Sequence, residues 1–145
     1  MSEIRDVIRT KLLTNSTLSA ALGSSVLSGM TVGTSYKSIF YDHLPDDSGV
    51  VYPVIVMFDV SGTKWPTNVN RIKSSRWQFD IEASTLTTIE TIKKLVIDTL
   101  DKWTYSDSSY AIKKCLWDND SKPEYDVDMN LWSVTIEFII EFQIK

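Results

Sequence analysis

The C-terminal segment 131–145, LWSVTIEFIIEFQIK, alternates between apolar and polar residues over almost its whole length. Every even position is apolar: Trp132, Val134, Ile136, Phe138, Ile140, Phe142 and Ile144. A period of two residues predicts a β-strand with one face buried in a core. At about 3.3 Å per residue the strand would be roughly 45 Å long, which is long for a small domain. We therefore expect neighbouring strands, a covering layer, and an edge that is open to another subunit.

Upstream segments predict the remaining strands of a sheet. Residues 76–82 (RWQFDIE) alternate cleanly, and residues 51–60 (VYPVIVMFDV) form a strand in which Val54, Val56, Phe58 and Val60 share a face. Residues 38–43 and 110–117 predict weaker strands, and the second of these is expected to form a hairpin with the last strand. Residues 24–38 are rich in Ser, Thr and Gly and are expected to form a flexible loop.

Three helices are expected. The first presents Ile4, Val7, Ile8 and Leu12 at helical spacing, and a short second helix follows Ser16 as its N-cap and ends at Gly23, in a position with positive φ. A long helix follows a capping box at 87–90, and its apolar stripe would cover the sheet: Ile89, Ile92, Val96, Leu100 and Trp103. The sequence predicts a single α+β domain, 1–145, with an antiparallel sheet of about four strands packed against one long helix, and an N-terminal helix.

Composition narrows the possible function classes. The formal charge of −4 argues against general binding of nucleic acid or anionic membranes. The lone Cys115 excludes an internal disulfide and a cysteine zinc cage, and fits a reducing cytoplasm. No apolar run reaches membrane-spanning length, and the N-terminus lacks the apolar core of a signal peptide, so we expect a protein that is made and stays in the cytosol unless it is assembled into a larger particle.

Candidate chemistry is sparse. His43 is the only histidine and lies close to Asp42, Asp46 and Asp47, which could form a metal site or orient a general base. A histidine in a turn is more often simply solvated, and Cys115 could pair with His43 only through the tertiary fold. The acidic segment 118–128 fails as a calcium loop, because Lys122, Pro123 and Met129 occupy positions that need an oxygen ligand, Gly and Glu. We predict no catalytic residue, cofactor or metal.

The long polar connection 61–75 is the favoured candidate for an interface. Hairpin loops are usually shorter, and Trp65 beside Pro66 has no obvious role in core packing. The candidate interface residues are Lys64, Trp65, Pro66, Asn68 and Arg71. We expect Trp65→Ala to lower assembly more than it lowers the melting temperature of the monomer.

Taken in order, several segments of this sequence resemble the tail terminator or head-to-tail joining (tail completion) proteins of tailed bacteriophages. They are the N-terminal helix with TLSAALG, then IFYDHLP, YPVIVMFDVSGT, RWQFDIEAST, a helix ending LDKW, and YDVDMNLWSVTIEFIIEF. The resemblance covers most of the chain. It implies an α+β subunit without enzymatic activity that assembles into a ring, typically a hexamer.

The resemblance further implies a virion protein of the tail or neck, made in the cytoplasm of a bacterial host. Its ring would cap the head-proximal end of the tail tube, contact the tail tube protein and the connector, and let DNA pass through the lumen without sequence-specific binding. Two alternatives remain: a head-completion adaptor on the connector, and a small cytosolic enzyme that uses His43. A monomeric regulatory module that merely shares the fold is a weaker third.

Overall fold

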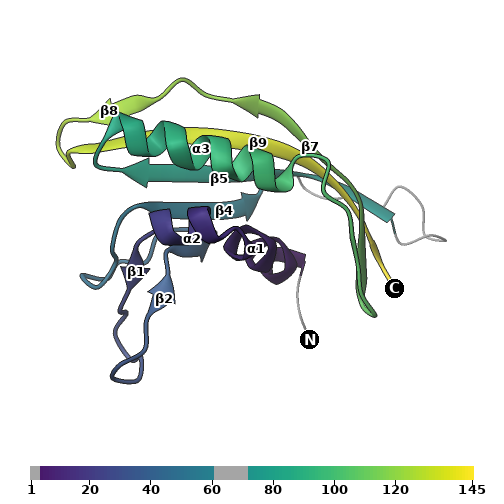
Figure 1. The fold of residues 1–145 in the computed structure, drawn as a ribbon, viewed down its shortest axis with the longest axis horizontal. Helices are drawn as coiled ribbons and strands as arrows, with labels where there is room; N and C mark the ends of the chain where they lie inside the picture. The colour runs from purple at the N-terminus through teal and green to yellow at the C-terminus, as the bar shows by residue number, and fades with distance from the viewer. Residues whose placement is uncertain (1–3, 61–71) are drawn as a thin grey trace.

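The computed structural model describes residues 4–60 and 72–145, which form a mixed α+β fold (Figure 1). The helices and strands have the following bounds: α1 (Ile4–Thr14), α2 (Ser16–Ala21), β1 (Ser24–Ser25), β2 (Tyr36–Lys37), β3 (Ile39–Tyr41), β4 (Val54–Asp59), β5 (Ile72–Ala83), α3 (Leu86–Leu100), β6 (Tyr105–Ser106), β7 (Tyr110–Asp120), β8 (Glu124–Asp126) and β9 (Leu131–Ile144). The predicted α+β class is confirmed.

The C-terminal strand β9 is central in the main sheet. It pairs antiparallel with β5 along one edge, from Ala83 opposite Trp132 to Ile72 opposite Gln143. Along its other edge it pairs with β7 and then with β8, so the predicted hairpin is confirmed. The described chain forms a seven-stranded sheet in the order β3-β4-β5-β9-β7-β6, with β8 extending the β7 side. The prediction of about four antiparallel strands was too low, and β3 pairs with β4 in parallel.

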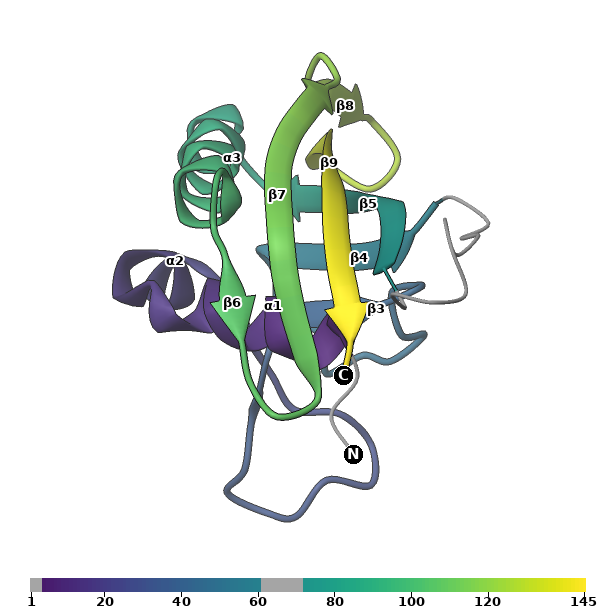
Figure 2. The ribbon, with the colours of Figure 1, turned by 90° about the vertical axis from the view of Figure 1, so that its right-hand side faces the viewer.

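All three helices lie against one face of this sheet, which curls around them at one end (Figures 1 and 2). The even-numbered residues of β9 from Val134 to Phe142 are at most 4% exposed and point toward the helices. Phe138 packs edge-on against Phe79 of β5, with ring centroids 5.6 Å apart. Burial of these large apolar side chains is what holds the helices on the sheet.

Strand β4 buries both of its faces. Its helix-facing residues are Ile55 and Met57, which lie opposite Ile81 and Phe79 in the register with β5. Val54 and Val56 are also buried, but on the face turned away from the helices. The predicted shared face of 54, 56, 58 and 60 is therefore not the face that joins the main core.

The N-caps of α2 and α3 differ from those predicted. Asn15, rather than Ser16, caps α2 by accepting the backbone N–H of Leu18 at 3.1 Å. Thr85 caps α3 by accepting the backbone N–H of Thr88 at 3.2 Å, so this helix begins before the predicted capping box. At each helix the predicted cap and the observed cap both have a side-chain oxygen that can accept a backbone N–H. Local sequence therefore does not decide between Asn15 and Ser16, or between Thr85 and Thr87.

Residues 24–38 were expected to be a flexible loop, and residues 24–37 form an arm that extends from the body of the domain (Figure 1). Its base is an antiparallel pair of short strands, β1 and β2. Two buried hydroxyls fix this base, because Ser25 Oγ and Ser38 Oγ lie 2.7 Å apart and Ser38 Oγ donates to the carbonyl of Val51 at 2.7 Å. The backbone N–H of Val51 donates to Ser25 Oγ at 2.9 Å. This network satisfies the buried hydroxyls and joins the base of the arm to the backbone at Val51, although the segment has no hydrophobic periodicity.

Candidate functional site

All five predicted interface residues, Lys64, Trp65, Pro66, Asn68 and Arg71, lie outside the described residues. Their role therefore stays a prediction. The described residues carry the remaining candidates: the His43 turn, Cys115, the surface grooves, and the exposed ends of the sheet.

His43 lies on the exposed turn after β3, and its backbone N–H donates to the carbonyl of Tyr41 at 2.7 Å. Its neighbour Asp42 has a positive φ of 68° and forms an ion pair with Arg5 at 3.4 Å. Across residues 4–60 and 72–145, no group of His, Cys, Asp and Glu side chains is arranged to hold a metal ion. The acids near His43 in sequence therefore form no ligand set with it.

Cys115 is fully buried on the helix-facing side of β7. Burial raises the pKa of its thiol to about 12, and the charge of Asp101 adds to the effect. The thiolate needed for nucleophilic chemistry is thus scarce at neutral pH. The thiol lies in the core, whereas His43 is exposed, so the structure does not bring the two together as a nucleophile and base.

A groove of about 370 Å³ lies between α1 and the β6 region. Trp103 lines the groove, and the ammonium group of Lys11 lies over the Trp103 ring, 5.8 Å from the ring centroid. The carboxylates in the groove are already engaged, because Asp6 accepts the hydroxyl of Tyr41 at 2.7 Å and Asp107 accepts that of Tyr105 at 2.5 Å. This hydrogen bond from Tyr105, followed by backbone N–H donors, lowers the pKa of Asp107. The groove holds packing and turn-forming groups rather than a free acid or base.

The first exposed end of the sheet is the β8–β9 turn, residues 124–130 (EYDVDMN), which we call the acidic tip. Every residue in it is exposed, and acids alternate with the exposed apolar side chains Tyr125, Val127 and Met129, which are 44%, 75% and 60% exposed. The tip has a defined conformation, since Asp126 Oδ1 accepts the backbone N–H groups of Asp128 and Met129 at 2.9 and 3.2 Å. Tyr125 also packs on Trp132 with centroids 5.1 Å apart.

A hollow of about 240 Å³ lies beside the acidic tip and is lined in part by Tyr52, Glu82 and Asp126. Burial raises the pKa of Glu82, and the neighbouring carboxylates of Asp80 and Asp126 raise it further. Because the pKa is higher in the folded chain than in the unfolded chain, ionised Glu82 costs stability above its folded pKa, and this cost disappears as the pH falls below the unfolded value.

Glu82→Gln should therefore raise the melting temperature at pH 8 and leave it unchanged at pH 4, because the variant lacks the carboxylate charge that the folded state disfavours. The gain should be modest, since the side chain is only partly buried. Thermal unfolding of both proteins across this pH range measures it. Glu90→Gln, on the exposed side of α3, is the control and should leave the curve unchanged. A Glu82→Gln gain that persisted at pH 4 would contradict the electrostatic cause.

The second exposed region is residues 113–117 of β7, which we call the lysine edge. A β-bulge between Ile112 and Lys114 leaves the consecutive side chains of Lys113 and Lys114 both exposed. Leu116 and Trp117 follow, 38% and 44% exposed. The strand was predicted from sequence, but the exposure of these apolar residues was not. The signal available in the sequence was the pair KK inside a strand, which breaks the apolar alternation.

The sequence matches no protein-family model and no curated protein. The fold does have a counterpart among solved structures. A chain in the virion of a native gene transfer agent particle superposes with a TM-score of 0.67 and 12% identity, over 93% of this chain and 90% of that one. The likeness therefore extends over nearly the whole domain, and it is a likeness of fold. None of the helices in the described ranges is long and apolar enough to cross a membrane.

Proposed function

We propose that this chain is a structural virion protein that forms a ring at the head-proximal end of a phage tail tube and joins the tube to the head connector. The observation that carries the proposal is the shared fold with a virion chain over nearly the full length of both proteins. The ordered set of sequence segments that resemble tail terminator proteins supports the finer role. The proposed partners are further copies of this chain, the tail tube protein and the connector.

The chemistry of the described residues agrees with a role in assembly. The thiol is buried, and the carboxylates of the groove between α1 and the β6 region are held by hydrogen bonds. The sheet face turned away from the helices carries more acids than bases: Asp80, Glu82, Glu137 and Glu141 against Arg76 and Lys114. A surface with excess negative charge repels the phosphate backbone, which fits passage of DNA through a lumen without retention.

Electron microscopy of the purified protein, alone and mixed with purified tail tubes, tests the proposal. Rings, or caps on one end of the tubes, are the expected result. A monomer that caps no tube would overturn the proposal. Co-sedimentation with filled heads rather than with tails would instead favour the head-completion adaptor.

His43→Ala separates the structural role from the enzyme alternative. Because His43 is exposed and forms no metal site, we expect the variant to assemble and to complete infectious particles as the wild type does. Complementation of a phage that lacks the gene measures this. A large loss of infectivity with unchanged assembly would indicate chemistry at His43.

A further inference from the structure

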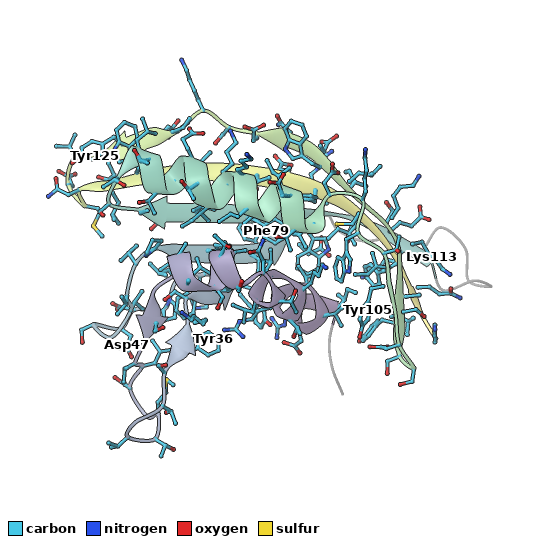
Figure 3. All side chains as sticks on the ribbon, in the orientation of Figure 1. Tyr36, Asp47, Phe79, Tyr105, Lys113 and Tyr125 are labelled. Atoms are coloured by element: carbon cyan, nitrogen blue, oxygen red, sulfur yellow. The ribbon has the colours of Figure 1, made fainter. Side chains whose placement is uncertain are left out.

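We propose that the acidic tip of one copy of this chain docks on the lysine edge of a second copy. The inference deepens the proposed function, since it rests on ring formation and assigns the two surfaces that meet. Residues 124–130 adjoin the start of β9, whereas residues 113–117 pair with its second half, and Figure 3 shows Tyr125 and Lys113 far apart along the sheet.

In the described part of the chain, the acidic tip combines carboxylates that have no cationic partner with apolar side chains that are exposed to solvent. The carboxylates of Glu124, Asp126 and Asp128 form no ion pair in the described chain, and the nearest cation in sequence, Lys122, lies outside the turn. Three large apolar side chains stand exposed between these acids. Exposed apolar groups gathered at one rigid turn mark a surface that another protein covers. The partner must therefore offer both positive charge and apolar area.

The lysine edge offers that combination. The two acids that follow it on β7 are already paired, Asp118 with Arg76 and Asp120 with Lys93. Glu141 lies opposite Lys114 in the register but forms no ion pair with it within 4.0 Å among the described residues. Asp101 accepts the backbone N–H of Trp117, and the adjacent Lys102 offsets its charge. Lys113 and Lys114 thus remain as excess positive charge on this edge. The exposed Leu116 lies on the same face as Lys114, opposite Ile139, and the exposed Trp117 lies on the other face, opposite Phe138, so apolar area stands on both sides of the edge.

The two surfaces cannot meet within one molecule. In the strand register Tyr125 lies opposite Trp132, and Lys114 lies opposite Glu141. These two positions of β9 are nine residues apart. At about 3.3 Å per residue Lys114 and Tyr125 are separated by roughly 30 Å along the same strand. A contact between different surfaces of identical chains is heterologous, and it produces a closed ring when the rotation between copies closes. The complementarity of charge and of apolar area on one chain therefore identifies a second copy as the occupant.

The arm at residues 24–37 is the competing candidate for a subunit contact. Residues 12–36 contain no charged side chain, and Val32 near the end of the arm is 99% exposed. Because residues 24–36 of the arm carry no charge, the arm offers no charge complementarity of the kind that exists between the lysine edge and the acidic tip. The acidic tip and the lysine edge are therefore the two surfaces that we assign to the contact between copies.

Charge reversal on the full chain tests the docking. Lys113→Glu with Lys114→Glu, and separately Glu124→Lys with Asp128→Lys, should each raise the protein concentration at half-assembly by about tenfold or more, because attraction becomes repulsion. Asp126 is left intact because it fixes the turn. Combining all four changes in one chain restores opposite charges and should return assembly toward the wild-type value. Analytical ultracentrifugation and electron microscopy measure assembly, and circular dichroism confirms folding.

Lys94→Glu is the matched control for the single variant Lys113→Glu. Each variant reverses the charge of one exposed lysine, but only Lys113 lies on the lysine edge. Lys94→Glu should leave assembly unchanged. Rings that form normally in both double variants would overturn the docking and leave the proposed function standing. A wild-type chain that never associates, with or without tail tubes, would overturn both. Failure of the four-change chain to recover, with its fold intact, would show that the patches meet other surfaces.

Discussion

Phe138→Ala should lower the free energy of unfolding by about 3–5 kcal/mol, the cost of deleting a large buried ring and leaving a cavity. Phe138 is fully buried at the centre of β9 and packs edge-on against Phe79 across the strand pair, with centroids 5.6 Å apart. The central strand contacts β5 on one side and β7 on the other, so its neighbours cannot move in to fill the space. Urea denaturation followed by tryptophan fluorescence measures the loss.

Ile139→Ala provides the comparison. Ile139 follows Phe138 on the same strand, but it is only partly buried and lies on the face away from the helices. Its loss should be clearly smaller, because less apolar area is removed from contact. Equal losses at the two positions would show that the core does not lie on the helix side of the sheet. A normal unfolding free energy for Phe138→Ala would contradict the central position of β9.

The long elements of this fold could be predicted because their sequences repeat one period over many residues. In β9 the buried set from Val134 to Phe142 is the even-numbered set read from the sequence. In α3 the buried residues Ile89, Ile92, Val96 and Leu100 belong to the predicted stripe. A regular face of that length has few alternative ways to be buried, so local pattern and tertiary structure agree.

The short elements could not be predicted in the same way. Strands β1, β2 and β6 contain two residues each, too few to establish a period. Gly23 was expected to end α2 with a positive φ, whereas positive φ among the described glycines occurs at Gly29 and Gly33. Gly23 is required for a different reason, since a Cβ there would lie 2.0 Å from the carbonyl oxygen of Val51. A close approach between two backbone segments that are distant in the sequence cannot be predicted from the residues around Gly23.

The candidate surfaces were only partly predictable. The sequence showed that residues 118–128 are acidic, and it predicted an open edge near the last strand. It treated that acidic segment as one loop, but Asp118 to Asp120 belong to β7 and residues 124–126 to β8. Two of the acids are neutralised by Arg76 and Lys93, which come from other elements. Only the fold shows which carboxylates remain without a cation.

Gly49→Ala should destabilise the protein by about 1–3 kcal/mol, because the added Cβ has no room. That atom would lie 1.6 Å from the carbonyl oxygen of Val26 and 3.1 Å from the Asp47 carboxylate. The obstacle is backbone, so it cannot be relieved by a side-chain rotation. The backbone N–H of Val26 donates to the carbonyl of Gly49 at 3.0 Å, and Asp47 accepts the N–H groups of Ser28 and Gly49, both at 2.8 Å. Relieving the clash must therefore loosen the arm.

Two measurements separate loosening of the arm from general damage to the fold. Chemical denaturation gives the loss of stability, and limited proteolysis should show faster cleavage within residues 26–35 of Gly49→Ala. Ser48→Ala is the control, because this neighbouring side chain is exposed and its substitution should change stability by no more than about 0.5 kcal/mol. Unchanged stability and unchanged cleavage in Gly49→Ala would mean that Gly49 and Val26 are not in contact in solution. The arm base would then owe its order to the Ser25 and Ser38 hydroxyl network alone.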